Sequence, residues 1–532
     1  MKRVLKTSLI AAFSVSVLVL SFACVEKVNG LAHLAQQQSL PSPTPTSRTT
    51  PKPSVSPTPV QTLENLQAKI RERLFTPEVR RGRVGVKITS LNTGKVIFEN
   101  DVEKYFIPAS NMKNFTVAAA LEKLGPDFRF VTSVYANAAP DASGTVKGDL
   151  RIFGRGDVSI STAFNYGDYY KGIDNLVERI AAAGVKRIEG DLVGDDSYFK
   201  GYAVPYTWEW DDLQWYDGAE ISALPINNNA VDLNVKPGAA SGLPCVVIVL
   251  PQTALMPIIN TCTTTAAGES TLRVFKPIGR NTLEISGTIP SSYKGFDGYI
   301  AFSRPAEMFM ELLKQRLQFK NIIVTGKSGL EQGKPTYNIT LVEIAKLESP
   351  PFGVIAAQTM KPSQNMFTET ILWTLGEQFG RQSSPTASSS TLGMNVVKEW
   401  MKQIGISNDA VIQYDGSGLS RHNQVTPSSV ITLYAYMAKQ SRHKQAWLDS
   451  LTVGGVDGTL RRRFAGTTAE RNFRGKTGTL DQVSALSGYL TTAAGEQVVV
   501  SIMVNAVMGP PTRTSLIDDI VVQLANFNGR ID

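Results

Sequence analysis

Apolar and polar residues alternate with two different periods at the start of the folded part of this chain. Between Leu63 and Leu74 the leucines and isoleucine are three or four residues apart, which predicts a helix. From Val84 to Ile88 every second residue is apolar, which predicts a strand. The turn residues Asn92-Thr93-Gly94 then precede the apolar run at 96–98, so we expect the helix to lead into a β-hairpin.

The C-terminal end repeats this pattern in reverse order. Residues 474–480, 483–490 and 497–505 read as successive antiparallel strands, and Val498 to Val504 form a nearly continuous apolar run. Apolar residues between Leu516 and Leu524 then return to helical spacing. We therefore predict an α/β (α+β) fold in which helices from both ends of the chain cover one antiparallel sheet.

The middle of the chain predicts an insertion into this body. Strand-like runs occur at 245–250 and 283–289, and a helical pattern covers 306–317. We expect a body made of residues 63–138 and 341–532, with one or two strand-rich domains inserted at 139–340.

The N-terminus predicts export. Lys2, Arg3 and Lys6 precede an apolar stretch from Ser8 to Ala23, with Cys24 directly after it. Residues 1–24 are thus a signal peptide or anchor, and three outcomes stay open: lipidation of Cys24, simple cleavage, or an uncleaved anchor. Residues 25–62 are rich in Pro, Ser and Thr and predict a tether.

Composition narrows the chemistry. The chain is 42% hydrophobic and 19% charged, as soluble globular proteins are, and its net charge of +8 comes without a dense basic run, which argues against nucleic acid as a partner. The chain has three histidines, which are His33, His422 and His443. A histidine metal site or a serine-histidine triad therefore has few side chains to draw on. We expect neither a metal nor an organic cofactor. Cys245 and Cys262 form a disulfide or remain two buried thiols.

A hydroxyl and an amine stand three residues apart at the start of a predicted helix, 110–124. Residues at this spacing are neighbours on a helix, so the Lys113 amine can reach the Ser110 hydroxyl. A serine needs a base to become a nucleophile, and lysine is protonated at neutral pH unless burial or another cation lowers its pKa. By itself the pair is also typical of an ordinary helix with a serine cap.

Two further segments could complete such a site. Lys476-Thr477-Gly478-Thr479 lies on a predicted strand, where Lys476 could lower the pKa of Lys113 and attract a carboxylate. Ser363-Gln364-Asn365 opens a predicted helix and supplies a second hydroxyl and an amide. Ser420 and Asn423 are a competing pair with a different spacing.

The ordered set Ser110-x-x-Lys113, Ser363-x-Asn365 and Lys476-Thr477-Gly478 resembles the penicillin-binding proteins and class A β-lactamases. The long interval between the first two motifs and the stretches 190–199 and 415–420 resemble the S13 family of D-alanyl-D-alanine carboxypeptidases. The resemblance implies the penicillin-binding protein/β-lactamase-like transpeptidase fold. It also implies a periplasmic or cell-envelope location.

The resemblance implies roles for each motif residue. Ser110 is the nucleophile and Lys113 its base, while Ser363 assists proton delivery and Asn365 orients the peptide. The backbone N–H groups of Ser110 and Thr479 hold the oxyanion. Lys476, Thr477 and Thr479 bind the substrate's terminal carboxylate, and Gly478 is a further substrate-binding residue. The implied partners are peptidoglycan stem peptides, with β-lactams as covalent inhibitors and a possible membrane tether. A β-lactamase and a non-catalytic wall-binding or sensor protein remain alternatives.

Several other residues have two readings. Trp208, Trp210 and Trp215 predict packing in a core or domain interface, with stacking on wall glycan as the alternative. Asn227-Asn228-Asn229 predicts a turn, and Asp415 is either an organiser of the loop that follows it or a plain turn residue.

Overall fold

The computed structural model describes residues 59–331 and 341–531. The predicted signal peptide at 1–24 and nearly all of the predicted tether lie outside these residues. Among the helices of the described ranges, none combines the length and the apolar character that crossing a membrane requires.

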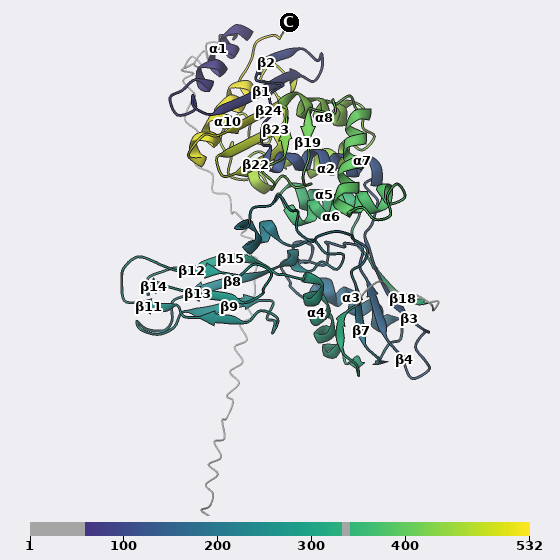
Figure 1. The fold of residues 1–532 in the computed structure, drawn as a ribbon. Helices are drawn as coiled ribbons and strands as arrows, with labels where there is room; N and C mark the ends of the chain where they lie inside the picture. The colour runs from purple at the N-terminus through teal and green to yellow at the C-terminus, as the bar shows by residue number, and fades with distance from the viewer. Residues whose placement is uncertain (1–58, 332–340, 532) are drawn as a thin grey trace, which may run out of the picture. The chain divides into compact units, whose positions relative to one another are not determined.

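A six-stranded sheet joins the two ends of the chain, in the order β2-β1-β24-β23-β22-β21 (Figure 1). Every neighbouring pair is antiparallel. The purple N-terminal strands therefore lie beside the yellow C-terminal ones, as the patterns at both ends predicted. The strands are β1 (Arg83–Ser90), β2 (Val96–Asn100), β21 (Thr452–Val453), β22 (Arg474–Leu480), β23 (Val483–Thr491) and β24 (Gln497–Asn505).

Both faces of this sheet are covered. The even-numbered residues of β24 from Val498 to Val504 pack with the apolar residues of α1 (Leu63–Leu74) and α10 (Pro510–Ala525). Val499 and Met503 point to the opposite face, because successive side chains of a strand alternate, and pack with a group of buried helices. Burial on both faces explains why β24 reads as a continuous apolar run.

That second group of helices contains two of the motif residues, Lys113 at the start of α2 and Asn365 at the start of α6. It comprises α2 (Lys113–Leu124), α5 (Phe352–Met360), α6 (Asn365–Leu375), α7 (Ser389–Gln403), α8 (Pro427–Lys439) and α9 (Lys444–Ser450). All eleven residues of α6 and residues 113–121 of α2 are buried. Any ionisable group among these buried residues therefore lies in an interior of low dielectric constant.

The inserted region begins with a mixed sheet. Its order is β17-β7-β5-β3-β18, covered by α3 (Lys171–Ala182) and α4 (Pro305–Phe319). β3 and β18 flank the expected range 139–340 and pair with each other, and β3 also pairs with β5. We therefore propose that the limits of the insert lie nearer residues 131 and 348. The strands are β3 (Val131–Ala136), β5 (Leu150–Phe153), β7 (Leu192–Asp195), β17 (Ser328–Leu330) and β18 (Val342–Glu348); β4 (Thr145–Lys147), β6 (Arg187–Glu189) and β16 (Ile323–Val324) form a small parallel sheet beside them.

Short strands make up the rest of the insert. Cys245 and Cys262 are joined by a disulfide, with their Cα atoms 5.4 Å apart, which settles the two alternatives for these cysteines. The single strand expected at 283–289 is divided at Gly287, whose φ is +91° and where a Cβ would lie 2.2 Å from Thr271 O. The strands are β8 (Ala230–Lys236), β9 (Val246–Leu250), β10 (Ile258–Asn260), β11 (Thr263–Thr265), β12 (Arg273–Phe275), β13 (Leu283–Ser286), β14 (Thr288–Pro290) and β15 (Phe296–Ala301).

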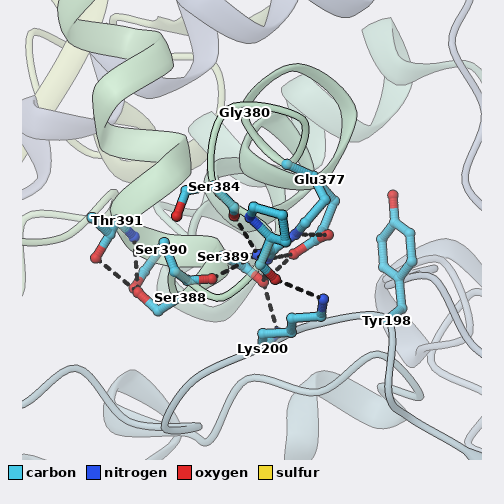
Figure 2. Close-up of polar contacts among 12 residues, drawn as sticks. Tyr198, Lys200, Glu377, Gly380, Ser384, Ser388, Ser389, Ser390 and Thr391 are labelled. Atoms are coloured by element: carbon cyan, nitrogen blue, oxygen red, sulfur yellow. Dashed lines mark hydrogen bonds and ion pairs between the residues drawn. The ribbon is translucent and has the colours of Figure 1, made fainter.

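A polar network fastens one segment of the insert to the start of α7. Figure 2 shows Lys200 beside Ser389: the Lys200 N–H donates to Ser389 Oγ at 2.7 Å, and the Ser389 N–H donates back to Lys200 O at 2.8 Å. Ser389 also donates to the Glu377 carboxylate, which pairs with Arg381. The insert is therefore bonded to α7, and through Ser389 to Glu377, which follows α6 in the chain.

Candidate active site

Ser110 lies in a turn that precedes the helix rather than in the helix itself. The sequence predicted one helix over 110–124, but residues 109–112 form a 3₁₀ turn (η1, Ala109–Met112), and α2 begins at Lys113. Ala109 has a φ of +47°, a conformation that non-glycine residues rarely adopt. The turn still places Lys113 Nζ 2.9 Å from Ser110 Oγ, which is the contact that the spacing predicted.

The Lys113 amine has three oxygen neighbours. Besides Ser110 Oγ, it donates to Asn365 Oδ1 at 2.6 Å and to the backbone oxygen of Ser417 at 2.7 Å. A neutral amine has two N–H groups and one lone pair. If the two N–H groups stay on Asn365 and Ser417, the lone pair faces the Ser110 hydroxyl, which is the orientation that a general base requires.

Burial lowers the pKa of Lys113 to about 8, and the carboxylates of Asp415, Glu369 and Asp217 oppose this by favouring the charged form. Of the two causes that the sequence offered, burial and a second cation, burial lowers the pKa of Lys113, and Lys476 is not among the groups that shift it. Lys476 is itself fully buried, and burial followed by the charge of Lys113 holds its pKa well below the ordinary value. The repulsion between the two amines therefore acts on Lys476.

The second motif, Ser363-x-Asn365, contacts the third motif, Lys476-Thr477-Gly478. Lys476 Nζ donates to Ser363 Oγ at 2.8 Å and to Thr477 O at 2.9 Å. Ser363 precedes α6 with a φ of +70°, a strained conformation of the kind that concentrates at functional sites. Asn365 is the first residue of α6, and its Nδ2 donates to Asp217 O of the insert at 3.0 Å.

Close contacts hold strand β22 against the Ser110 turn. A Cβ on Gly478 would lie 2.5 Å from Pro108 O and 3.1 Å from Ser110 N, so only glycine allows this approach. Asn111 Nδ2 donates to Lys476 O at 3.1 Å from the other side. Thr477 Oγ1 bonds to Thr459 Oγ1 at 2.7 Å, whereas Thr479 is exposed.

A cavity of about 370 Å³ contains these groups. Its walls include Ser110, Ser363, Asn365, Thr477 and Thr479. The insert also contributes to it, through Asp212, Tyr216 and Asp217. A larger cavity of about 740 Å³ lies between α3 and β18, but no motif residue lines it, so size alone does not identify the catalytic site.

The comparison with known proteins decides the family. Residues 66–527 match the family described as D-Ala-D-Ala carboxypeptidase 3 (S13). The chain belongs to this family. The resemblance drawn from the three motifs is thereby confirmed, and the chain's activity class is that of a D-alanyl-D-alanine carboxypeptidase, a hydrolase.

Individual relatives of this S13 peptidase cover nearly all of its folded part. The D-alanyl-D-alanine carboxypeptidase of Actinomadura sp. (strain R39) is 33% identical over 481 residues, which are 88% of this chain and 86% of the relative. The carboxypeptidase DacB of Haemophilus influenzae is 27% identical and covers 79% of this chain and 85% of the relative. The crystal structure of penicillin-binding protein 4 from Haemophilus influenzae has the same fold, with a TM-score of 0.73, 24% identity, and coverage of 87% of this chain and 99% of that one.

Two buried carboxylates accept hydrogen bonds from the backbone of the loop that follows Asp415. Asp415 accepts hydrogen bonds from the N–H groups of Gly418 at 2.7 Å and Ser420 at 2.6 Å. Trp208 Nε1 of the insert donates to the same carboxylate at 2.9 Å. Asp415 therefore organises the loop that presents Ser417 O to Lys113, the first of the two readings of this residue.

Glu369 is the second of these carboxylates, and sequence reasoning missed it. It accepts from the N–H groups of Gly416 and Ser417 at 2.7–3.0 Å, and burial, followed by the charge of Asp415, raises its pKa. The sequence did contain a signal for Glu369. It is the one acidic residue between 365 and 375, and it lies one helical turn after Asn365.

The remaining predicted residues have structural surroundings. Asn423 Nδ2 donates to Asp415 Oδ1 at 2.7 Å, so the competing Ser420–Asn423 pair stabilises the loop. His422 packs against Tyr414, with ring centres 5.3 Å apart. Trp208 is buried and Trp215 packs against Phe296, but Trp210 is 69% exposed, so the packing prediction fails for Trp210.

Proposed function

We propose that this S13 peptidase uses Ser110 as a nucleophile to cleave the bond between the two terminal D-alanines of peptidoglycan stem peptides. The observation that carries the proposal is the 2.9 Å contact between Lys113 Nζ and Ser110 Oγ. Ser110 lines a cavity together with the second hydroxyl, Ser363, which accepts a hydrogen bond from the buried amine of Lys476. No step of this chemistry calls for a metal or an organic cofactor.

Acylation begins when Lys113 accepts the Ser110 proton and Ser110 Oγ attacks the penultimate carbonyl carbon. The backbone N–H groups of Ser110 and Thr479 bind the resulting oxyanion. Lys476, Thr477 and Thr479 bind the terminal carboxylate of the substrate, and the Asn365 amide orients the peptide.

Collapse of this intermediate breaks the C–N bond and requires a proton on the leaving amine. Ser363 donates that proton and regains one from Lys476, to which it is bonded at 2.8 Å. The charge newly formed on Lys113 lowers the pKa of Lys476, which favours this transfer. In hydrolysis the water gives its proton back through Ser363 to Lys476, and Lys113 returns its proton to Ser110 Oγ.

The test measures D-alanine release from a pentapeptide that ends in D-Ala-D-Ala. We expect wild type to release D-alanine and Ser110→Ala to release none above background. Ser420→Ala is the matched control from the competing motif, because the backbone N–H that bonds to Asp415 is retained. Equal release by wild type and Ser110→Ala would refute the mechanism.

A second measurement separates the alternative functions. Incubation with benzylpenicillin is expected to add the mass of one drug molecule to wild type and nothing to Ser110→Ala. Sustained nitrocefin turnover without D-alanine release would identify a β-lactamase instead. Acylation without any peptide hydrolysis would identify a sensor.

We also propose that the chain is exported and works in the periplasm or cell envelope, held by its N-terminal segment. The basic and apolar residues before Cys24 and the Pro-rich segment after it support this. Labelling with radioactive palmitate in wild type but not in Cys24→Ala would show lipidation. A shortened chain that begins after residue 24 would show cleavage.

A further inference from the structure

A second cavity, of about 390 Å³, adjoins the catalytic one. Tyr216 and Pro362 line both cavities. Gln364 and Phe367 from the start of α6 form part of its wall, while β8 and β15 contribute Asp232 and Tyr299. Material that extends from the catalytic cavity past Tyr216 therefore enters this second space, which the mechanism above does not use.

The Asn227–Asn229 turn forms one side of this cavity. Its three residues have φ values of +47°, +62° and +55°, and a run of left-handed residues without glycine is costly, at roughly 1 kcal/mol or more per residue. Two of the side chains hold the turn: Asn229 Nδ2 donates to Glu220 O, and Asn227 Nδ2 donates to Tyr169 O. The predicted turn is confirmed, in a strained form.

Asn228 has no such structural role within the described part of the chain. Its Oδ1 atom is buried and has no hydrogen-bond partner among the described residues, yet the residue lines the cavity. A buried polar atom without a partner costs about 1–3 kcal/mol. A ligand that donates a hydrogen bond into the cavity would remove this cost.

The other walls combine aromatic rings with polar groups. The rings of Tyr216 and Tyr299 lie 5.5 Å apart, and Tyr299 is 53% exposed. Asp232 accepts from the Tyr169 hydroxyl through one carboxylate oxygen. Gln364 Oε1 accepts from the Met366 N–H. Aromatic faces beside amides and a carboxylate suit a ring with one apolar face and hydroxyl and amide groups at its edge, which is the chemistry of an N-acetylated sugar.

The charge of the cavity points in the same direction. Its lining contains the carboxylate of Asp232 and no Lys, Arg or His. A second peptide with free carboxylates would be repelled by Asp232 and would find no cation there. The amino sugar that carries a stem peptide is neutral, because its own carboxyl group is used in the amide bond to the peptide.

We propose that this second cavity is a subsite for the N-acetylated amino sugar to which the stem peptide is attached. The proposal rests on the function proposed above and extends its substrate from the peptide to the sugar-linked peptide. A four-residue stem in an extended form spans roughly 13–14 Å, which is enough to reach from Ser110 into a cavity that shares a wall with the catalytic one.

The experiment compares kcat/KM for D-alanine release from a free pentapeptide and from the same pentapeptide linked to N-acetylmuramic acid. We expect wild type to prefer the sugar-linked substrate about tenfold. Tyr299→Ala and Asn228→Gly, in which glycine keeps the positive φ, are expected to reduce this preference to near unity. The control is Tyr202→Ala, which removes a tyrosine that is 90% exposed and lies outside both linings and retains the preference.

Two outcomes would overturn the subsite. Wild type could hydrolyse both substrates equally well, or the two variants could keep the full preference for the sugar-linked substrate. The failure of the proposed function looks different, because neither substrate would then release D-alanine. Acylation of Ser110 by benzylpenicillin in each variant verifies that the protein is folded.

Discussion

Acylation of Ser110 is expected to depend on pH through Lys113, because only the neutral amine can accept the serine proton. With a pKa of about 8, roughly one Lys113 amine in ten is neutral at pH 7. At the ordinary lysine pKa of about 10.4, only about one in 2,500 would be neutral. Burial thus raises the reactive fraction at neutral pH by roughly 250-fold, and acylation should rise about tenfold per pH unit below pH 7.

Asp217 offers a way to move this dependence in a known direction. Its carboxylate favours the charged form of Lys113 and so raises the pKa of Lys113. Asp217→Asn removes the charge and keeps the backbone oxygen that accepts from Asn365. The pKa of Lys113 should fall, the acid limb should move to lower pH, and acylation at pH 6 should become faster.

The assay is the second-order rate constant for acylation by benzylpenicillin between pH 5.5 and 8, measured by mass spectrometry or stopped flow. Asp481→Asn is the matched control: it lines the same cavity but is exposed, so solvent screens its charge from Lys113. A flat profile in wild type would refute Lys113 as the base. A shift to higher pH in Asp217→Asn, or an equal shift in the control, would refute the electrostatic reasoning.

Three further predictions concern packing and stability. Gly478→Ala would place a Cβ 2.5 Å from Pro108 O, so acylation should fall at least tenfold while circular dichroism shows the fold retained. Trp208→Phe removes the hydrogen bond to Asp415, which should cost about 1–3 kcal/mol in urea unfolding and reduce acylation. Cys262→Ala opens the disulfide of the insert, whose 17-residue separation corresponds to about 3 kcal/mol of loop entropy; thermal unfolding should show this loss while the acylation rate stays near that of wild type.

The sequence was sufficient for the parts of the fold that follow a clear period. The alternation in β1 and the apolar run in β24 predicted two strands of one antiparallel sheet. The structure makes them direct neighbours, although more than 400 residues separate them. The three motifs also predicted which side chains would meet. Each pair of motifs is in contact, through Lys113 and Asn365, Ser363 and Lys476, or Asn111 and Lys476.

The local shape of the site could not be predicted in the same way. Ala109 and Ser363 adopt positive φ values that no propensity favours. Tertiary contacts impose them: a Cβ on Gly418 would lie 1.9 Å from Ala109 O, so the loop and the turn touch through their backbones. The pKa of Lys113 could not be predicted from the sequence either. It depends on complete burial and on the charge of Glu369, and both follow from the packing of α6 in the folded protein.

The insert has a physical reason to be retained beyond its own stability. The Asn365 amide donates a hydrogen bond to Asp217 O, and Trp208 Nε1 donates one to the Asp415 carboxylate. Two groups of the site are therefore held in place by residues of the insert. Removal of the insert would leave both groups without these partners. It would also remove Asp217, whose carboxylate favours the charged form of Lys113. The same long interval that distinguished this chain from a compact β-lactamase thus supplies hydrogen-bond partners and a charge to the surroundings of Lys113.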